Sequence, residues 1–272
     1  MAERLAATLT VELVDDASSA TRWRSSSALK LMLPRPRGPA VWACAATYGG
    51  GLLAGDRIDL DLRVGVGAAL CLGTQSTTKV YRSTGPEAVQ DLQAEVAAGG
   101  LLAILPDPLS PFAGSRYRQR SRLQLAAGAS LAWLDTVSAG RIACDERWQL
   151  AGYDARTDLE LDGRLIMRDT LRLGADAAGR LGRYAAIATL LLIGPRAAES
   201  AQAARSLAEL HRPGEEGLLA TASPLADGIL LRLAAVDLEV LAGKVRSVIA
   251  PLAGPLAGTP WLRLASVETA CT

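Results

Sequence analysis

Four segments of this chain share a pattern that restricts the fold more than any other feature of the sequence. In each, an apolar, strand-like stretch meets a small-residue turn and continues as a second apolar stretch. One unit is too small to bury its own apolar face, so the units have to stack on one another. The sequence therefore predicts a mainly β fold, in which short strands from residue 10 to about residue 173 stack in a β-helix-like course. An ordinary all-β protein with glycine turns at similar intervals is the alternative. The turns are centred on Gly67, Gly99, Gly128 and Gly163.

The densest glycine run lies in the segment TYGGGLLAGDRIDLDL, residues 47–62. A phosphate-binding loop needs Lys and then Ser or Thr after its last glycine, whereas Asp56 and Arg57 stand there in this chain. A dinucleotide-binding turn needs a helix to follow, but the residues from Ile58 onward alternate between apolar and polar, as in a half-buried strand. The run is therefore predicted to be a tight turn that enters a strand, with positive φ angles that favour glycine.

Two α-helices are expected in the C-terminal third of the sequence. Pro195 fits the first position of a helix that runs to about His211, because the missing N–H of proline costs nothing there. Asp237 is a good N-cap for a second helix that reaches about Leu252. The apolar stripe expected on the first helix is Ser200, Ala203, Ala204, Leu207 and Leu210. The apolar face expected on the second is Leu238, Leu241, Val245, Val248, Ile249 and Leu252.

Short strands complete this third of the chain near residues 218–221 and 229–233, with a last strand in WLRLA at residues 261–265. No flexible linker separates the β-rich and helix-bearing parts. We therefore expect one domain over residues 1–272, with a β-rich body at about 8–193 and a helix-bearing part at about 194–272.

Composition argues against several classes of partner. Half of the residues are hydrophobic but only 4% are aromatic, so the core has to be built from Ala, Leu and Val. The net charge of +1 provides no field for nucleic acid or an anionic membrane, and the longest apolar run, residues 184–194, is too short to span a bilayer. The cysteines are far apart and form no C-x-x-C motif, which favours buried thiols in a reducing cytoplasm. They are Cys44, Cys71, Cys144 and Cys271.

Side chains for catalysis or tight metal binding are scarce. His211 is the single histidine, so a His-rich zinc or nickel site cannot be built from this chain alone. Paired carboxylates are available, which leaves a carbohydrate-active β-helix enzyme as an alternative, although the low aromatic content counts against a sugar groove. The carboxylates are Asp56, Asp59, Asp61, Asp145 and Glu146. Arginines at alternate positions of one strand predict either a solvated face or a patch for a protein partner; they are Arg116, Arg118, Arg120 and Arg122.

Three blocks in fixed order resemble the urease accessory protein family UreD, also called UreH. The blocks are GGGLLAGDRIDLDLRVGVGA, TQSTTKVYRS at residues 74–83 and DTVSAGRIACDERW at residues 135–148. The second and third blocks are the more specific ones, because glycine-rich strands are common. The residues that match the family pattern are Gly50, Gly51, Gly55, Asp56, Thr78, Lys79, Tyr81, Arg82, Ser83, Gly140, Arg141, Glu146 and Trp148.

The resemblance implies a role without enzymatic activity. UreD-like proteins bind the urease apoprotein and UreF, and through UreF the GTPase UreG, and together these proteins insert nickel into urease. The family is thought to carry nickel through an internal polar passage, so the ion is cargo and no tightly bound cofactor is expected. The implied fold is mainly β, β-helix-like, with two helices, which agrees with the fold predicted from the repeat.

Carboxylates suit an ion in transit, because oxygen ligands hold nickel weakly and release it. The candidates for a transient nickel path are Asp56, Asp61 and Glu146. Asp56 has the alternative role of accepting backbone N–H bonds in the glycine turn, and Glu146 has that of pairing with Arg141 or Arg147. The chain departs from the family pattern at three places, which puts the transfer of individual roles in doubt: Thr47-Tyr48 replaces Pro-Pro, Asp107-Pro108 replaces Gln-Glu, and Asp145 replaces Gly.

Overall fold

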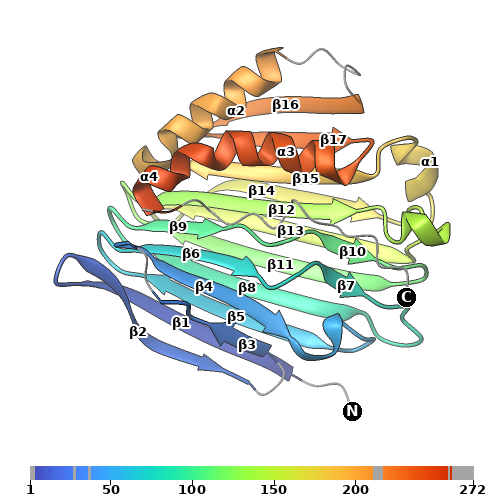
Figure 1. The fold of residues 1–272 in the computed structure, drawn as a ribbon, viewed down its shortest axis with the longest axis horizontal. Helices are drawn as coiled ribbons and strands as arrows, with labels where there is room; N and C mark the ends of the chain where they lie inside the picture. The colour runs from blue at the N-terminus through green and yellow to red at the C-terminus, as the bar shows by residue number, and fades with distance from the viewer. Residues whose placement is uncertain (1–3, 27–28, 36–37, 211–216, 257, 259–272) are drawn as a thin grey trace.

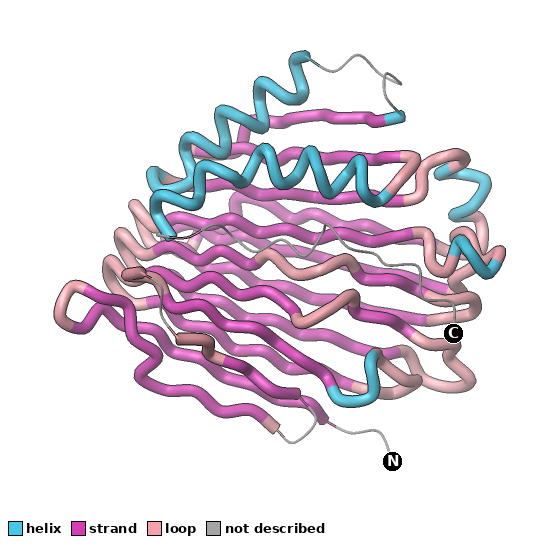
Figure 2. The backbone as a smooth tube through the Cα atoms, in the orientation of Figure 1, coloured by secondary structure: helices cyan, strands magenta, loops and turns pink. Residues whose placement is uncertain are grey.

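A computed structural model describes residues 4–26, 29–35, 38–210, 217–256 and 258 of the chain. Two β-sheets lie face to face, and two helices cover part of the outer surface of one of them (Figures 1 and 2). Sheet A has the strand order β14-β13-β11-β8-β5-β1-β2, and sheet B has the order β16-β17-β15-β12-β9-β6-β4-β3, with β7 and β10 attached to it.

The strands of sheet A are β1 (Arg4–Val14), β2 (Ala17–Ser25), β5 (Arg57–Val64), β8 (Ala88–Val96), β11 (Arg116–Leu125), β13 (Gly152–Leu161) and β14 (Arg164–Leu173). Those of sheet B are β3 (Leu29–Met32), β4 (Val41–Thr47), β6 (Ala69–Thr74), β7 (Thr78–Val80), β9 (Leu101–Ile104), β10 (Leu109–Pro111), β12 (Ser130–Ser138), β15 (Ala186–Ile193), β16 (Leu218–Leu225) and β17 (Gly228–Ala235). The α-helices are α1 (Ala177–Leu181), α2 (Ala198–Leu210), α3 (Leu238–Ile249) and α4 (Ala253–Leu256), and short 3₁₀ turns are η1 (Tyr48–Gly50), η2 (Ile142–Cys144), η3 (Pro195–Ala197) and η5 (Ala250–Leu252).

The predicted stack of strands is confirmed. The chain passes from a strand of sheet A to a strand of sheet B and back, so β5, β8, β11 and β13 are parallel neighbours in one sheet and β4, β6, β9 and β12 in the other. Gly67, Gly99 and Gly128 turn the chain between the sheets with φ of 68°, 68° and 71°. These turns also stack, because Gly67 N donates to Ala98 O and Gly99 N donates to Gly128 O.

The fourth glycine plays a different part from the one predicted. Gly163, with φ of 73°, follows Asp162, with φ of 49°, in the tight turn between β13 and β14. These two strands are antiparallel neighbours in sheet A, so this unit is a hairpin and not another turn of the stack. Two consecutive positive φ angles match the right-handed twist of a hairpin, which is why the sequence looked like the other units and yet folds differently.

Each face of sheet B packs against a separate apolar layer. Between the sheets, inward side chains such as Leu62, Leu102 and Leu123 are fully buried, and nearly all of this layer is Leu, Val, Ile and Ala. On the outer face, residues such as Leu134 and Leu190 pack under α2 and α3. The period-two pattern of β5 confirms its prediction, because every second residue from Ile58 is buried.

The second predicted helix is confirmed, and the stripe of the first needs correction. Asp237 accepts a hydrogen bond from Glu239 N at the start of α3, and the buried side chains include Leu241, Val245 and Ile249. In α2, Ser200 and Ala204 are buried as expected, but Ala201 is buried instead of Ala203, and Leu210 is 79% exposed. The face of α2 that packs on sheet B is therefore turned toward Ala201, because the small residues there let the helix lie close to the sheet. His211 and residues 261–265 fall outside the described residues.

Arg196 connects the helical layer to the stack of turns. Its guanidinium Nη1 donates to the carbonyl oxygens of Gly67, Ala68 and Gly99, at 3.3, 3.4 and 3.3 Å, and its Nη2 donates to Pro255 O at 3.0 Å. Partial burial lowers the pKa of Arg196. The helices are thereby fixed to the turn end of the sheets.

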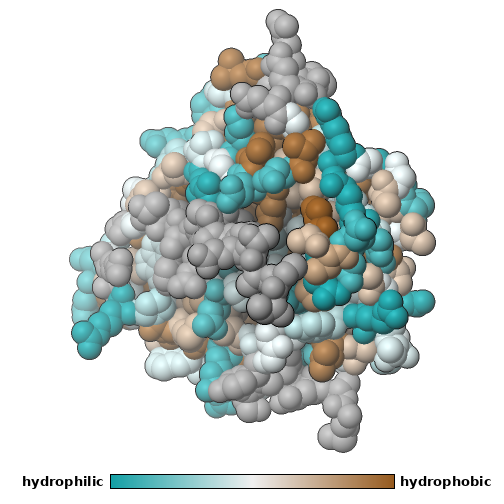
Figure 3. Space-filling model, turned by 45° about the vertical axis from the view of Figure 1, so that its right-hand side comes forward, coloured by the Kyte–Doolittle hydropathy of each residue, from teal (hydrophilic) through white to brown (hydrophobic). Residues whose placement is uncertain are grey.

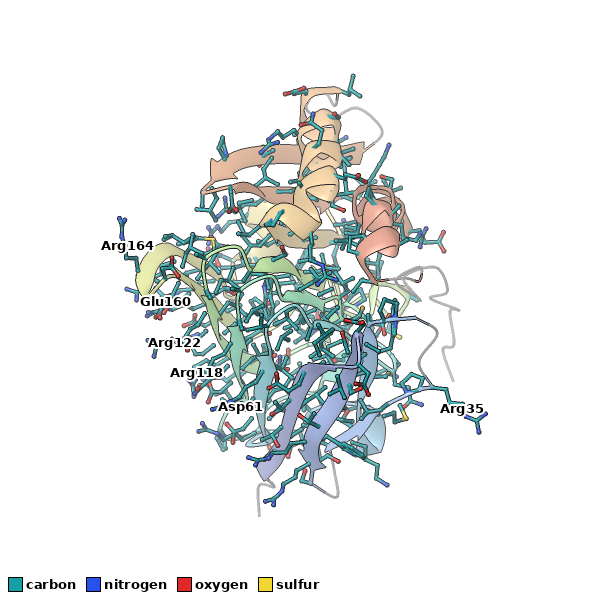
Figure 4. The ribbon with its side chains drawn as sticks, turned by 90° about the vertical axis from the view of Figure 1, so that its left-hand side faces the viewer. Arg35, Asp61, Arg118, Arg122, Glu160 and Arg164 are labelled. Atoms are coloured by element: carbon teal, nitrogen blue, oxygen red, sulfur yellow. The ribbon has the colours of Figure 1, made fainter. Side chains whose placement is uncertain are left out.

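The outer face of sheet A carries the alternating arginines predicted for β11. Arg118 pairs with Glu87 at 2.8 Å, Arg120 with Asp154 at 3.1 Å and Arg122 with Glu160 at 2.7 Å. Figure 4 shows Arg118, Arg122 and Glu160 projecting from this face in a row. Because the arginines are matched by carboxylates on neighbouring strands, the face is charged but close to neutral. Exposed large apolar residues, such as Trp23 and Val66, are scattered, and apolar atoms are interspersed with polar ones in the view of Figure 3.

Replacing Asp158 measures how much the ion pairs of this charged face contribute to stability. Its carboxylate accepts hydrogen bonds from Arg156 at 2.6 Å and Arg168 at 2.9 Å, and these bonds lower its pKa to about 2. Asp158→Asn should lower the free energy of unfolding by ~1 kcal/mol at pH 7. Because the folded-state pKa is lowered, this contribution is present above the ordinary pKa of Asp and is lost as the pH falls toward about 2.

The measurement is denaturant unfolding of both proteins from pH 7 down to pH 2. Glu95→Gln is the matched control on the same face, because Glu95 is 57% exposed and lies 3.9 Å from its partner Arg63. An Asp158→Asn effect that stays constant over this range would contradict a role for the charged carboxylate.

Candidate functional site

The three blocks singled out in the sequence meet at one cavity between the sheets. The cavity has a volume of about 120 Å³, which is room for several water molecules. The first block contributes Gly50, Ile58 and Leu60, the second contributes residues 74–78, and the third contributes Asp135 and Thr136. Gln75 and Ser76 are exposed, so the cavity reaches the surface beside the second block. Its polar lining is Thr47, Thr74, Gln75, Ser76, Thr77, Thr78, Gln90, Asp107, Gln119, Asp135 and Thr136.

The glycine run forms the tight turn that the sequence predicts. Gly49, Gly50 and Gly55 have φ of 83°, 72° and 85°, and Gly51 packs against the second block so closely that a Cβ there would lie 2.6 Å from Lys79 O. The Asp56 carboxylate accepts a hydrogen bond from Leu53 N at 2.8 Å. Asp56 therefore closes the turn through its side chain, as one of the two roles considered for it required.

Aromatic and charged residues of the second and third blocks join at the same end of the sheets. The Tyr81 and Phe112 rings pack in a T-shaped arrangement with their centres 5.3 Å apart, and the Arg141 guanidinium lies over the Phe112 ring, 4.3 Å from its centre. Ser83 Oγ accepts a hydrogen bond from Arg116 N at 3.0 Å. These contacts hold the TKVYRS segment against the loop before β11.

The third block is a loop folded around Glu146. The Glu146 carboxylate accepts hydrogen bonds from the Arg141 guanidinium and, at 3.1 Å, from Ala113 N. The Arg141 hydrogen bonds hold the pKa of Glu146 below its usual range. The buried Trp148 indole donates to Tyr184 O at 2.7 Å, which fixes the end of the loop. Asp145 has φ of 62°, a left-handed conformation that explains why glycine is usual at this position in the family pattern.

The three carboxylates proposed for an ion path are not brought together. Asp56 caps the glycine turn, Glu146 pairs with Arg141, and Asp61 lies on the outer face of sheet A, where it is 45% exposed and 3.4 Å from Arg63. Among the described residues, no group of three or more His, Cys, Asp or Glu side chains is arranged to bind a metal ion.

Two carboxylates line the cavity, Asp107 and, on β12, Asp135. Gln119 Nε2 donates to Asp135 Oδ2 at 3.1 Å, and Tyr117 Oη donates to Gln119 Oε1 at 2.9 Å. No arginine or lysine pairs with Asp135 in the described part of the chain. Burial raises the pKa of Asp135 to about 6, with a further rise from nearby Asp169, against the opposing hydrogen bond from Gln119.

A smaller cavity, of about 20 Å³, lies on the other side of Asp135 and is large enough for about one water molecule. Trp133 and Asp135 line both cavities. The other polar residues of the small cavity are Tyr153, Thr157, Asp169 and Thr189. Asp135 and Thr189 are register partners in sheet B, so their side chains lie side by side. We refer to the two cavities, which share the lining residues Trp133 and Asp135, as the polar path.

Comparison with known proteins connects this architecture to a family. Residues 4–265 match the family model described as UreD urease accessory protein. The chain belongs to this family.

Three relatives named as urease accessory protein UreD or D are similar to most of this chain. The urease accessory protein UreD of Anaeromyxobacter sp. (strain Fw109-5) is 45% identical over 260 residues, covering 91% of this chain and 86% of the relative. That of Sorangium cellulosum (strain So ce56) is 45% identical over 242 residues, covering 87% and 77%. Urease accessory protein D of Arabidopsis thaliana is 34% identical over 199 residues, covering 70% and 68%.

The UreD resemblance stated from three short blocks is thereby confirmed. Within the described ranges, every helix is too short or too polar to cross a lipid bilayer. Sequence reasoning missed Asp135 as a site residue, although one signal was available. The inward positions of β12 are Leu131, Trp133, Asp135 and Val137, so one carboxylate interrupts an apolar series.

The close contact at Gly51 gives a test of how the blocks fit together. A Cβ at Gly51 would lie 2.6 Å from Lys79 O and 2.7 Å from the Tyr81 ring. Gly51→Ala should therefore lower the free energy of unfolding by ~2 kcal/mol, because backbone atoms have to move. Gly85→Ala is the matched control, since nothing lies within 4 Å of the position that its Cβ would take. Thermal or denaturant unfolding measures both, and equal stabilities of the two variants would contradict the close packing of the first block on the second.

Proposed function

We propose that this protein is a non-enzymatic urease maturation factor that binds the urease apoprotein and, with UreF and UreG, supports GTP-dependent insertion of nickel. The single observation that carries the proposal is the polar cavity at Asp135, onto which all three family blocks converge. Membership of the UreD family supplies the link to urease.

The chemistry of the cavity suits an ion that moves through. Its polar atoms are hydroxyl, amide and carboxylate oxygens and amide nitrogens, and neither histidine nor cysteine is among its lining residues. Oxygen ligands bind divalent nickel more weakly than imidazole or thiolate ligands do. Two carboxylates, Asp107 and Asp135, in a lining of otherwise neutral polar groups attract a cation without the stronger ligands that would trap it. Nickel is therefore treated as cargo.

The proposed route enters near the TQSTT segment, passes Asp135 and continues toward Asp169. Asp107 lies near the entrance, where its Oδ2 accepts a hydrogen bond from Thr74 Oγ1 at 3.0 Å. Asp56, Asp61 and Glu146 have roles outside this route in the proposal, because each has a partner of its own in the turn, on the outer face or in the loop.

The exposed side of α2 is the surface we assign to UreF. Glu199, Gln202 and Glu209 are exposed there, while the opposite side of the helix is buried on sheet B. An amphipathic helix with one free polar side is a common docking element. UreG would then be reached through UreF, and no contact with nucleic acid or membrane is needed.

Among the described residues, most of the carboxylates predicted for a carbohydrate-active enzyme are held by ion pairs or backbone hydrogen bonds, which gives that alternative no specific support. The carboxylates once considered for it are tied elsewhere: Asp59 bonds to Arg57 at 2.9 Å, Asp56 to a turn amide and Glu146 to Arg141.

The maturation role predicts the outcome of a co-expression experiment. Urease subunits expressed with UreF and UreG but without this protein should stay nearly free of nickel and inactive, and adding this protein should restore both. The measurements are nickel per active site and urease activity, with pull-down of urease and UreF as the binding readout. Full nickel content in its absence would refute the proposal.

The proposed route predicts that replacing Asp135 lowers nickel loading without lowering the stability of the protein. Asp135→Asn keeps the size of the side chain but removes the charge, so nickel per urease active site should fall about tenfold after co-expression, because an amide is a far weaker partner for a divalent cation. The variant should melt no lower than wild type at pH 7, because a partly buried charge without a cationic partner destabilises the fold. Burial raises the folded-state pKa of Asp135 to about 6. Protonation of Asp135 therefore stabilises the wild-type fold at low pH, and this stabilisation is lost as the pH rises through about 6. Any gain in melting temperature should therefore vanish near pH 4.

Asp56→Asn is the comparison variant for this experiment. Its amide oxygen can still accept the bond from Leu53 N, so we expect a small loss of stability and nearly normal nickel loading. Normal loading by Asp135→Asn together with poor loading by Asp56→Asn would move the route to the glycine turn.

A further inference from the structure

The two sheets end differently beside β14. Sheet A stops at β14, whereas sheet B continues past β15 with β17 and β16. The described part of sheet A therefore has no strand beneath β17 on this side. The side chain that reaches across the opening is Arg232 of β17, whose Nη2 lies 2.5 Å from Oδ1 of Asp169 on β14.

Arg232 stands directly outside the smaller cavity. Asp169, its partner, lines that cavity, and so does Thr189, its register partner on β15. Thr189 is in turn the register partner of Asp135 on β12. One row across sheet B therefore runs from Asp135 through Thr189 to Arg232, from the interior to the surface.

The pair between Arg232 and Asp169 is placed where it can open. The Arg232 side chain is 46% exposed and that of Asp169 is 21% exposed. An ion pair with this much solvent contact contributes little to stability, and the long arginine side chain can turn into water without leaving a buried charge behind. The backbone of both strands is held by the sheets, so opening requires movement of one side chain only.

We propose that Arg232 is the gate residue of the polar path, closing its β14 side by pairing with Asp169 and swinging outward when a divalent cation takes its place at that carboxylate. This inference rests on the proposed function, since it assigns a residue that controls the same path. A guanidinium and a metal ion compete for Asp169, because both are cations and neither tolerates the other within a few ångströms. The path is thus closed when it is empty and opens to a cation that has reached its end.

The gate is tested without nickel by labelling a cysteine placed behind it. Thr189→Cys introduces a thiol of nearly the same size in the small cavity, and the full-length protein is treated with a small cationic methanethiosulfonate reagent. Labelling is followed by mass spectrometry of the peptide that contains residue 189, so the native cysteines do not interfere. We expect adding Arg232→Ala to raise the labelling rate about fivefold, in keeping with the weak hold of an exposed ion pair.

Three comparisons separate a gate from general loosening. Arg168→Ala removes an arginine of similar exposure, 52%, that pairs with Asp158 on the outer face, and it should leave the rate unchanged. Thr221 of β16 is the exposed register partner of Arg232, so Thr221→Cys should be labelled quickly with or without Arg232. An anionic reagent of similar size should gain less from Arg232→Ala than the cationic one, because Asp135 and Asp169 line the path behind the gate.

Unchanged labelling in Arg232→Ala, or an equal increase in Arg168→Ala, would overturn the gate. If Arg232→Ala does not fold, Arg232→Gln removes the charge while keeping a hydrogen-bonding side chain, and the same outcomes apply. The labelling result is independent of nickel delivery. Normal nickel loading by Asp135→Asn would therefore count against the proposed route alone, while the labelling rates decide whether Arg232 closes the opening.

Discussion

The in-register stacking of parallel strands is the constraint on which the rest of this structure depends. Because β5, β8, β11 and β13 in one sheet and β4, β6, β9 and β12 in the other keep their registers, each interior position continues as a row from strand to strand. Register alone therefore decides whether the neighbours of a polar residue in such a row are polar or apolar. The same holds across the antiparallel pair β12 and β15, where register places Asp135 beside Thr189 at the smaller cavity.

The polar residues of the path make the fold less stable than an apolar interior would. Asp135 has no cation beside it among the described residues, and Gln119 provides its hydrogen bond from the opposite sheet. Tyr153 is 2% exposed, yet within the described structure its hydroxyl has no hydrogen-bond partner. An interior of Leu and Val at these positions would be more stable. A chain that keeps a carboxylate and a phenol here is built for something other than maximal stability, and the proposed passage of a cation would account for the carboxylate.

The fold could be predicted further than the site. Glycine turns and alternating apolar residues are local signals, so the stacked strands, the glycine turn before β5 and the N-cap at Asp237 followed from the sequence. Gly163 was misassigned because a hairpin turn and a turn of the stack use the same residue types, and only strand direction separates them. The stripe on α2 was misplaced because small residues allow several rotations of a helix against a sheet, and Leu210 was left exposed. Asp135 was missed because its meaning depends on Gln119 and Thr189, which lie on other strands and become neighbours only through register.

The central claim is that a divalent cation enters the space between the sheets and meets Asp135. The most direct measurement is anomalous X-ray diffraction at the nickel edge, on crystals of the protein in its accessory complex after exposure to nickel. The account predicts an anomalous peak inside the protein, beside Asp135 or between Asp135 and Asp169, that disappears in crystals of Asp135→Asn. Nickel found only on the outer surface, with no peak between the sheets in wild type, would contradict it.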